Sequence, residues 1–98
     1  MRESLNEPIS VISYYQASTN KLQPCKLQWA NQEYLLGPVD FYHKTKQGVA
    51  TIHHFSLADT AGQIYFKLAC DGSTMHWVLE EYMPADSMQI NTPEGGSL

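Results

Sequence analysis

The segment ATIHHFSLADTAGQIYFKLACDGSTMHWVLEEY, residues 50–82, alternates apolar and polar side chains and is interrupted twice by turn residues. A period of two is typical of β-strands that bury one face. The loop Asp59–Gly62 and the pair Asp71-Gly72 are the two turn signals. The segment therefore predicts three antiparallel strands that are joined by two hairpins.

These two turns predict which residues face each other. A two-residue turn at Asp71-Gly72 pairs Cys70 with Ser73, and the four-residue loop before it pairs Ala58 with Gln63. Both registers bring apolar side chains together on one face. The predicted buried face contains Phe55, Leu57, Ile64, Phe66, Leu68, Met75, Trp77 and Leu79, with His53 at its rim. The opposite, polar face contains Ser56, Tyr65, Val78, His54, Lys67 and His76.

Further β-type runs complete the predicted sheet. The six runs are residues 8–16, 24–30, 33–44, 49–58, 63–70 and 73–83. Asn31-Gln32 is short enough to join the second and third runs as a hairpin. Gly37-Pro38 interrupts the third run, because proline donates no ladder hydrogen bond, and a helical turn near residues 38–44 is the alternative. We expect an all-β protein with a single small antiparallel sheet of five to six strands, a meander that curls into a half-barrel or an SH3-like roll.

The chain of 98 residues is long enough for one small domain. We expect this β domain at residues 7–83, between a flexible N-terminus at 1–6 and a disordered tail at 84–98. No apolar run is long enough to span a membrane, and the first ten residues lack the apolar region of a signal peptide. Cys25 and Cys70 lack the spacing of a disulfide framework. We therefore expect a soluble, cytoplasmic protein.

The histidines of the segment do not predict a metal site. His54 and His76 lie on either side of Lys67 in the predicted register, with their backbones roughly 9.5 to 10 Å apart. A cation between them would also face the Lys67 ammonium group. A solvated polar face is the simpler interpretation, and we expect no bound metal or cofactor.

The sequence also offers little for catalysis. Cys70 lies diagonally from His53 in the predicted register, but no acidic residue is placed to orient the imidazole and no helix N-terminus lowers the thiol pKa. Glu80 and Glu81 are consecutive in a strand, so we expect them on opposite faces. We therefore predict that the protein is not an enzyme.

The chain has six tyrosines and two tryptophans, more rings than one face of a small sheet can bury. The candidate interaction surface consists of Tyr65, His54, Lys67, His76, Tyr34 and Trp29. Our leading hypothesis is a non-catalytic module that holds an unknown protein or peptide partner on this surface or on an open sheet edge. The alternative is a single-stranded nucleic-acid binder that stacks bases on exposed rings. The net charge of -4 disfavours that alternative. A barrel that covers most of the rings is the competing structural interpretation.

Several motifs between residues 7 and 83 carry a family likeness. They are Glu7-Pro8-Ile9, the segment PCKLQWANQEYLL, the strand QIYFKL and Trp77-Val78-Leu79. In order and spacing they resemble a family of small uncharacterised bacterial β-domains, and they look similar to the C-terminal β segments of catalytically inactive Y-family polymerase accessory proteins. The resemblance implies one β-rich domain without an assigned reaction, in a DNA-repair setting by association. Those relatives are typically arginine-rich around the first hairpin, which this chain is not.

Overall fold

The computed structural model describes residues 3–84 of the 98. Its strands are β1 (Glu3–Gln16), β2 (Lys21–Trp29), β3 (Gln32–Gln47), β4 (Ala50–Asp59), β5 (Ile64–Asp71) and β6 (Trp77–Pro84). The six predicted strands are confirmed, and residues 38–44 belong to β3 rather than to a helical turn. Within the described range, no helix has the length and apolar character to cross a membrane.

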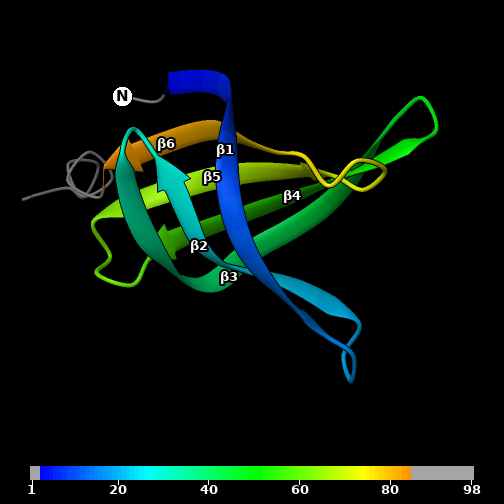
Figure 1. The fold of residues 1–98 in the computed structure, drawn as a ribbon, viewed down its shortest axis with the longest axis horizontal. Coiled ribbons are helices and arrows are strands. Elements are labelled where there is room, and N and C mark those ends of the chain that lie inside the picture. The colour runs from blue at the N-terminus through cyan, green and yellow to red at the C-terminus, as the bar shows by residue number, and fades with distance from the viewer. Residues whose placement is uncertain (1–2, 85–98) are drawn as a thin grey trace, which may run out of the picture.

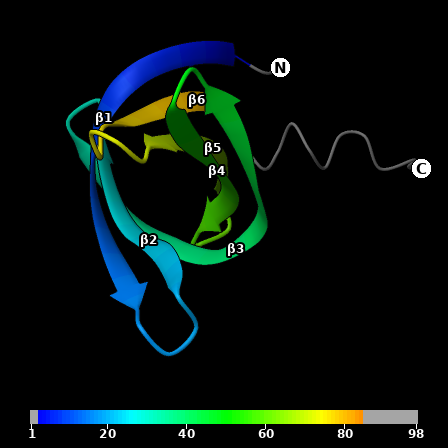
Figure 2. The same cartoon turned by 90° about the vertical axis from the view of Figure 1, so that its right-hand side faces the viewer.

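Each strand pairs antiparallel with the next one in the chain, and β1 also pairs with β6, which closes the sheet into a barrel (Figure 1, Figure 2). The prediction of one antiparallel meander is confirmed, and the sheet curls beyond a half-barrel. The closing strand β1 begins at Glu3, so residues 3–6, which we expected to be flexible, are part of it. The expected tail at 84–98 lies outside the described residues, apart from Pro84, which ends β6.

The core fills the inside of this barrel. Its buried side chains are Leu27, Leu36, Phe55, Leu57, Phe66, Leu68, Cys70, Trp77 and Leu79. The inward face predicted for β4 to β6 is therefore confirmed, with two differences. Ile64 is only partly buried, although it packs against the core. Met75 is 53% exposed, because it lies in the loop before β6 and not in the strand itself.

The connection between β5 and β6 is longer than predicted. Cys70 pairs with Trp77 and not with Ser73, so residues 72–76 form a loop in place of a two-residue turn. The Asp71 carboxylate shapes this loop, because its Oδ1 accepts hydrogen bonds from the Ser73 amide at 2.8 Å and the Ser73 hydroxyl at 2.7 Å. The predicted register was wrong by four residues, an even number, which is why the same side chains still face the core.

The other two predicted turns are also displaced. Ala58 pairs with Tyr65 rather than with Gln63, again an even shift that preserves the faces. The β2–β3 turn consists of residues 30–31 rather than 31–32. Both of its residues have positive φ angles, 54° and 62°, as a tight hairpin turn requires.

A bulge in β6 corrects our expectation for its two carboxylates. The ladder with β5 passes from Leu79 directly to Glu81, which leaves Glu80 as an extra residue. Both side chains then lie on the outer face. Glu80 Oε1 is 3.2 Å from His54 Nδ1, and Glu81 Oε1 is 4.0 Å from Lys67 Nζ. The prediction that they face opposite sides was wrong, because a bulge interrupts the alternation of side chains.

Candidate functional site

The barrel is fully paired at one end and open at the other. The β2–β3 ladder covers only residues 26–29 and 32–35. Elsewhere in the described chain, β2 pairs only with β1, and β3 only with β4. The β1–β2 and β3–β4 hairpins therefore diverge (Figure 1). We call the paired part the sealed end, and we call the part bordered by residues 21–25 of β2 and 39–47 of β3 the open end.

Two prolines mark the point of divergence. If the β2–β3 register continued, Pro24 and Pro38 would lie one step apart on facing edges. Neither has an amide hydrogen to donate to a ladder. The pairing of β3 with β4 also shifts twice between residues 36 and 41, which bends β3 at this point. The Gln23 side chain spans the gap, because its Nε2 donates to the Gly37 carbonyl oxygen at 3.4 Å.

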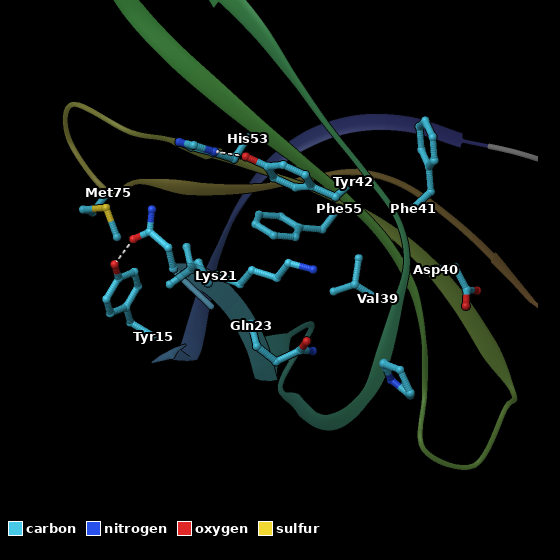
Figure 3. Close-up of a pocket in the computed structure, with 13 residues that line it drawn as sticks. Tyr15, Lys21, Gln23, Val39, Asp40, Phe41, Tyr42, His53, Phe55 and Met75 are labelled. Carbon is cyan, nitrogen blue, oxygen red and sulfur yellow. Dashed lines mark hydrogen bonds between the residues drawn. The ribbon is translucent and has the colours of Figure 1, made fainter. Parts of the chain in front are cut away.

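A cavity of about 720 Å³ lies between the diverging strands (Figure 3). One wall is aromatic. The Tyr42 ring stacks on His53 with centroids 5.9 Å apart, and the Tyr42 hydroxyl and His53 Nδ1 share a hydrogen bond of 2.7 Å. Burial raises the pKa of Tyr42, so its phenol keeps its proton at neutral pH. The centroid of the Phe55 ring lies 5.2 Å from that of Tyr42 and 5.5 Å from that of Trp77. Phe55 therefore connects this wall to the core.

The opposite wall comes from the β1–β2 hairpin. The Tyr15 hydroxyl donates to Asn20 Oδ1, and both residues line the cavity. The Lys21 side chain points into the cavity, and Gln23 lies beneath it (Figure 3). Met75, from the loop before β6, lies at the rim on the same side as Tyr15. The cavity thus combines ring surface with a single inserted ammonium group.

The β3 edge adds charge to the open end. Lys44 and Lys46 alternate with Tyr42 along β3, so all three side chains share one face of the strand. The Asp40 carboxylate turns away from the cavity (Figure 3), and its charge acts on Tyr65 on the outer face. Burial, followed by the charge of Asp40, raises the pKa of Tyr65. The two lysines therefore continue the Tyr42 face of β3 beyond the cavity lining, and Lys46 Nζ donates to Thr51 Oγ1 at 3.2 Å.

Four residues of the predicted interaction surface lie on or beside the outer face of β4 to β6. They are Tyr65, His54, Lys67 and His76. His54 is held firmly there, because Thr45 Oγ1 lies 2.8 Å from its Nε2, Glu80 lies against its Nδ1, and its ring stacks on His43 with centroids 4.4 Å apart. Both ring nitrogens are thus already hydrogen-bonded. Among the described residues, no group of three or more His, Cys, Asp or Glu side chains is arranged to hold a metal ion.

The other two residues of that surface lie inside the sealed end. The Trp29 ring is 4.8 Å from Tyr82, and the Tyr34 ring is 5.3 Å from Phe66, with centroids as the reference points. Trp29 Nε1 donates to Glu7 Oε1 at 3.0 Å. The structure therefore does not bring Trp29 and Tyr34 together with the outer-face residues, because closure of the barrel turns both rings toward the core.

Cys70 and His53 lie directly opposite each other in the β4–β5 ladder. Cys70 is fully buried, and burial, together with the charge of Asp71, raises the pKa of its thiol. A raised pKa disfavours the thiolate, which is the nucleophilic form. His53 Nδ1 is hydrogen-bonded to Tyr42. The Cys70 thiol itself donates to the Asp71 carbonyl oxygen at 3.9 Å, so its hydrogen bond is directed to the backbone and not to the imidazole.

The sequence interpretation missed the residues that line the open end. Tyr15, Lys21, Gln23 and Tyr42 belong to strand segments whose partners were not predicted. The available signal was the presence of Pro24 and Pro38 on the two strands of one hairpin, at nearly facing positions. That signal predicts where a ladder stops, but it does not predict the cavity that follows.

Comparison of the chain with protein-family models, with curated proteins and with solved structures finds no match. The resemblance to small bacterial β-domains and to polymerase accessory segments therefore stays a prediction.

Proposed function

We propose that the protein is a non-catalytic interaction module that holds an extended segment of a protein partner in the open end. The observation that carries this proposal is the pair of facing strand edges, residues 21–25 and 39–47, which do not pair with each other and of which residues 21–23 and 39–42 line the cavity. An unpaired strand edge presents amide hydrogens and carbonyl oxygens to an incoming strand. Peptide-binding domains use such edges for affinity and adjacent pockets for specificity.

The cavity supports the proposal because it provides the side-chain pocket. Alternate side chains of an added strand point to the same face, so every second side chain of the peptide would enter the cavity or lie over it. Tyr42 and Phe55 offer ring surface for an apolar group, and Lys21 and Gln23 offer polar contacts. Rings with a polar tip are enriched at protein interfaces for this reason.

The setting of the module is part of the same proposal. Cys25 and Cys70 are both free thiols, which supports a reducing compartment, and we place the protein in the cytoplasm. The resemblance to segments of polymerase accessory proteins supports a partner from a DNA-repair assembly.

A peptide-display selection on the immobilised full chain tests the proposal. We expect the selected peptides to bind Tyr42→Ala about tenfold or more weakly than wild type, because the variant loses a wall of the pocket. They should bind Leu35→Ala unchanged, since Leu35 is 60% exposed but lies outside the cleft. Amide chemical shifts should change in residues 39–47. A selection that enriches no peptide, or binding that is indifferent to Tyr42→Ala, contradicts the proposal.

A second candidate is binding of single-stranded nucleic acid at the same place. It is favoured by Tyr42, which is 45% exposed and shares its strand face with Lys44 and Lys46. The net charge of -4 opposes it. A fluorescently labelled oligonucleotide should then bind at low salt and dissociate steeply as salt rises. No binding at low salt eliminates this candidate.

A further inference from the structure

Lys21 is an exposed lysine of β2 that lines the cavity together with apolar side chains. Its side chain runs into the cavity (Figure 3), whose lining also includes Phe55 and Val39. Lys26 and Lys67 each lie within 4.0 Å of a glutamate, but Lys21 forms no ion pair with any side chain of residues 5–84. An ammonium group with no anion of its own chain beside it can donate a charge-assisted hydrogen bond to an anionic ligand. Lys21 is therefore placed to receive an anionic group from a ligand.

The carboxylates nearest to the cavity do not supply that anion. Asp40 belongs to the cavity lining, but its carboxylate turns outward (Figure 3), where its charge acts on Tyr65. The Asp71 carboxylate accepts two hydrogen bonds from Ser73 in the loop before β6. The cleft is thus locally positive in a chain whose net charge is -4, and this charge complementarity selects a negatively charged occupant.

Two more lysines lie on β3 just beyond the residues that line the cavity. Lys44 and Lys46 follow Tyr42 at alternate positions of β3 and share its face. Alternate residues of a strand are about 6.6 Å apart, which is also the spacing of alternate side chains in any extended peptide laid along that edge. Acidic side chains two residues apart in such a peptide therefore match the spacing of these lysines.

We infer that the open end selects acidic extended peptides, with Glu or Asp at alternate positions and one carboxylate inserted beside Lys21. This inference rests on the proposed function, because it names the class of segment that the cleft holds. The methylene groups of a glutamate pack against Phe55 and Val39 while its carboxylate accepts a charge-assisted hydrogen bond from Lys21 Nζ. An oligonucleotide matches the charge but has no peptide amides to pair with the edges of β2 and β3, so the strand edges favour a peptide.

Peptides with blocked termini test the inference. An acetylated and amidated peptide containing Glu-x-Glu is compared with its Gln-x-Gln counterpart by fluorescence anisotropy on the full chain. We expect the Gln peptide to bind about 10- to 100-fold more weakly, the range for losing a charge-assisted hydrogen bond. Lys21→Gln should weaken the Glu peptide by a similar factor and leave the Gln peptide unchanged. Lys67→Gln, the same charge change on the outer face, should leave both peptides unchanged.

Charge reversal gives a second, independent comparison. Lys21→Glu should bind Glu-x-Glu more weakly than Lys21→Gln does, because the new carboxylate repels the inserted glutamate, and far-UV circular dichroism reports whether this variant is folded. If Lys21→Glu is not folded, the binding of the Glu and Gln peptides to Lys21→Gln still tests the inference. Equal binding of Glu and Gln peptides overturns the inference and leaves the proposed function standing. Binding that needs a free C-terminal carboxylate, or tighter Lys21-dependent binding of a dT12 oligonucleotide, also overturns it. Binding of no peptide at all contradicts both proposals.

Discussion

Both ends of the barrel are rich in aromatic rings, but the rings that β2 and β3 contribute are partly buried against the core only at the sealed end. There, Trp29 packs against Tyr82, and Tyr34 meets Phe66 edge-on at an interplanar angle of 65°. At the open end, Tyr42 stays 45% exposed even though it also contacts two rings. Strand pairing explains the difference, because rings converge where β2 and β3 share a ladder and separate where the ladder ends. Residue type alone does not decide whether a ring is core or surface.

This difference between the two ends suggests that the sealed end contributes most to stability and the open end to binding. Elements with many buried apolar contacts carry most of the free energy of unfolding, whereas ligand-binding parts are commonly among the least stable. The sealed end has many buried apolar contacts, whereas the open end has the cavity and unpaired strand edges of a ligand-binding part. Substitutions at the two ends should therefore affect different measurements.

The largest expected difference is between Phe66→Ala and Tyr42→Ala. Phe66 is fully buried, so its truncation should lower the free energy of unfolding by about 3 to 5 kcal/mol. Tyr42 is partly exposed and makes one side-chain hydrogen bond, so its truncation should cost about 1 kcal/mol. Urea unfolding followed by circular dichroism measures both values.

If Phe66→Ala is too unstable to fold, Phe66→Leu provides a smaller cavity and a smaller loss at the same position. Equal losses at Phe66 and Tyr42 would show that the two ends are equally packed and would remove the basis of the comparison.

A smaller effect is expected from the hydrogen bond that joins β1 to the sealed end. Glu7→Ala removes the acceptor of the Trp29 indole N–H, and we expect a loss of about 1 kcal/mol. Glu33→Ala is the matched control, because it removes an exposed ion pair with Lys26, which should contribute about 0.5 kcal/mol or less. Urea unfolding distinguishes the two. A larger loss for Glu33→Ala would mean that the Trp29 contact does not help to close the barrel.

Most of the fold could be predicted because side-chain alternation survives register errors of even size. The predicted pairings of Cys70 and Ala58 were wrong by four and by two residues, yet Phe66 and Leu79 still face the core. The bulge at Glu80 could not be predicted in this way, because an inserted residue breaks the alternation on which the prediction depends.

The candidate site depends on pairing between distant segments, and local patterns do not report it. Trp29 and Tyr34 were predicted at the surface, but the β1–β6 closure turns them inward. The open end exists because β2 and β3 separate while each keeps its other partner. Pro24 and Pro38 indicate the place of that separation, whereas the distance between the separated strands follows from the rest of the barrel.

The smallest expected effect is a pH dependence of stability that arises in the loop at the open end and has no counterpart in the apolar core. The loop between β5 and β6, which carries Met75 to the rim of the cavity, is shaped by Asp71. Hydrogen bonds from the Ser73 hydroxyl and amide lower the pKa of Asp71 in the folded protein. The unfolded chain has an aspartate pKa of about 3.9. The folded state therefore favours the carboxylate, and this stabilisation is present above that pKa and is lost as pH falls through the lower, folded value.

We expect the thermal midpoint of Asp71→Asn to lie below that of wild type at pH 6 to 7 and to approach it in strong acid, because protonated Asp71 loses the same charge. The deficit of Phe66→Ala should persist at both pH values, since apolar packing does not titrate. Circular dichroism melts measure both variants. If the Asp71→Asn deficit were unchanged in acid, the loop would be held by the shape of the side chain and not by its charge. Ser73→Ala separates these cases further, because it removes the hydroxyl donor while the amide donor stays, and should therefore give a smaller deficit with the same pH dependence.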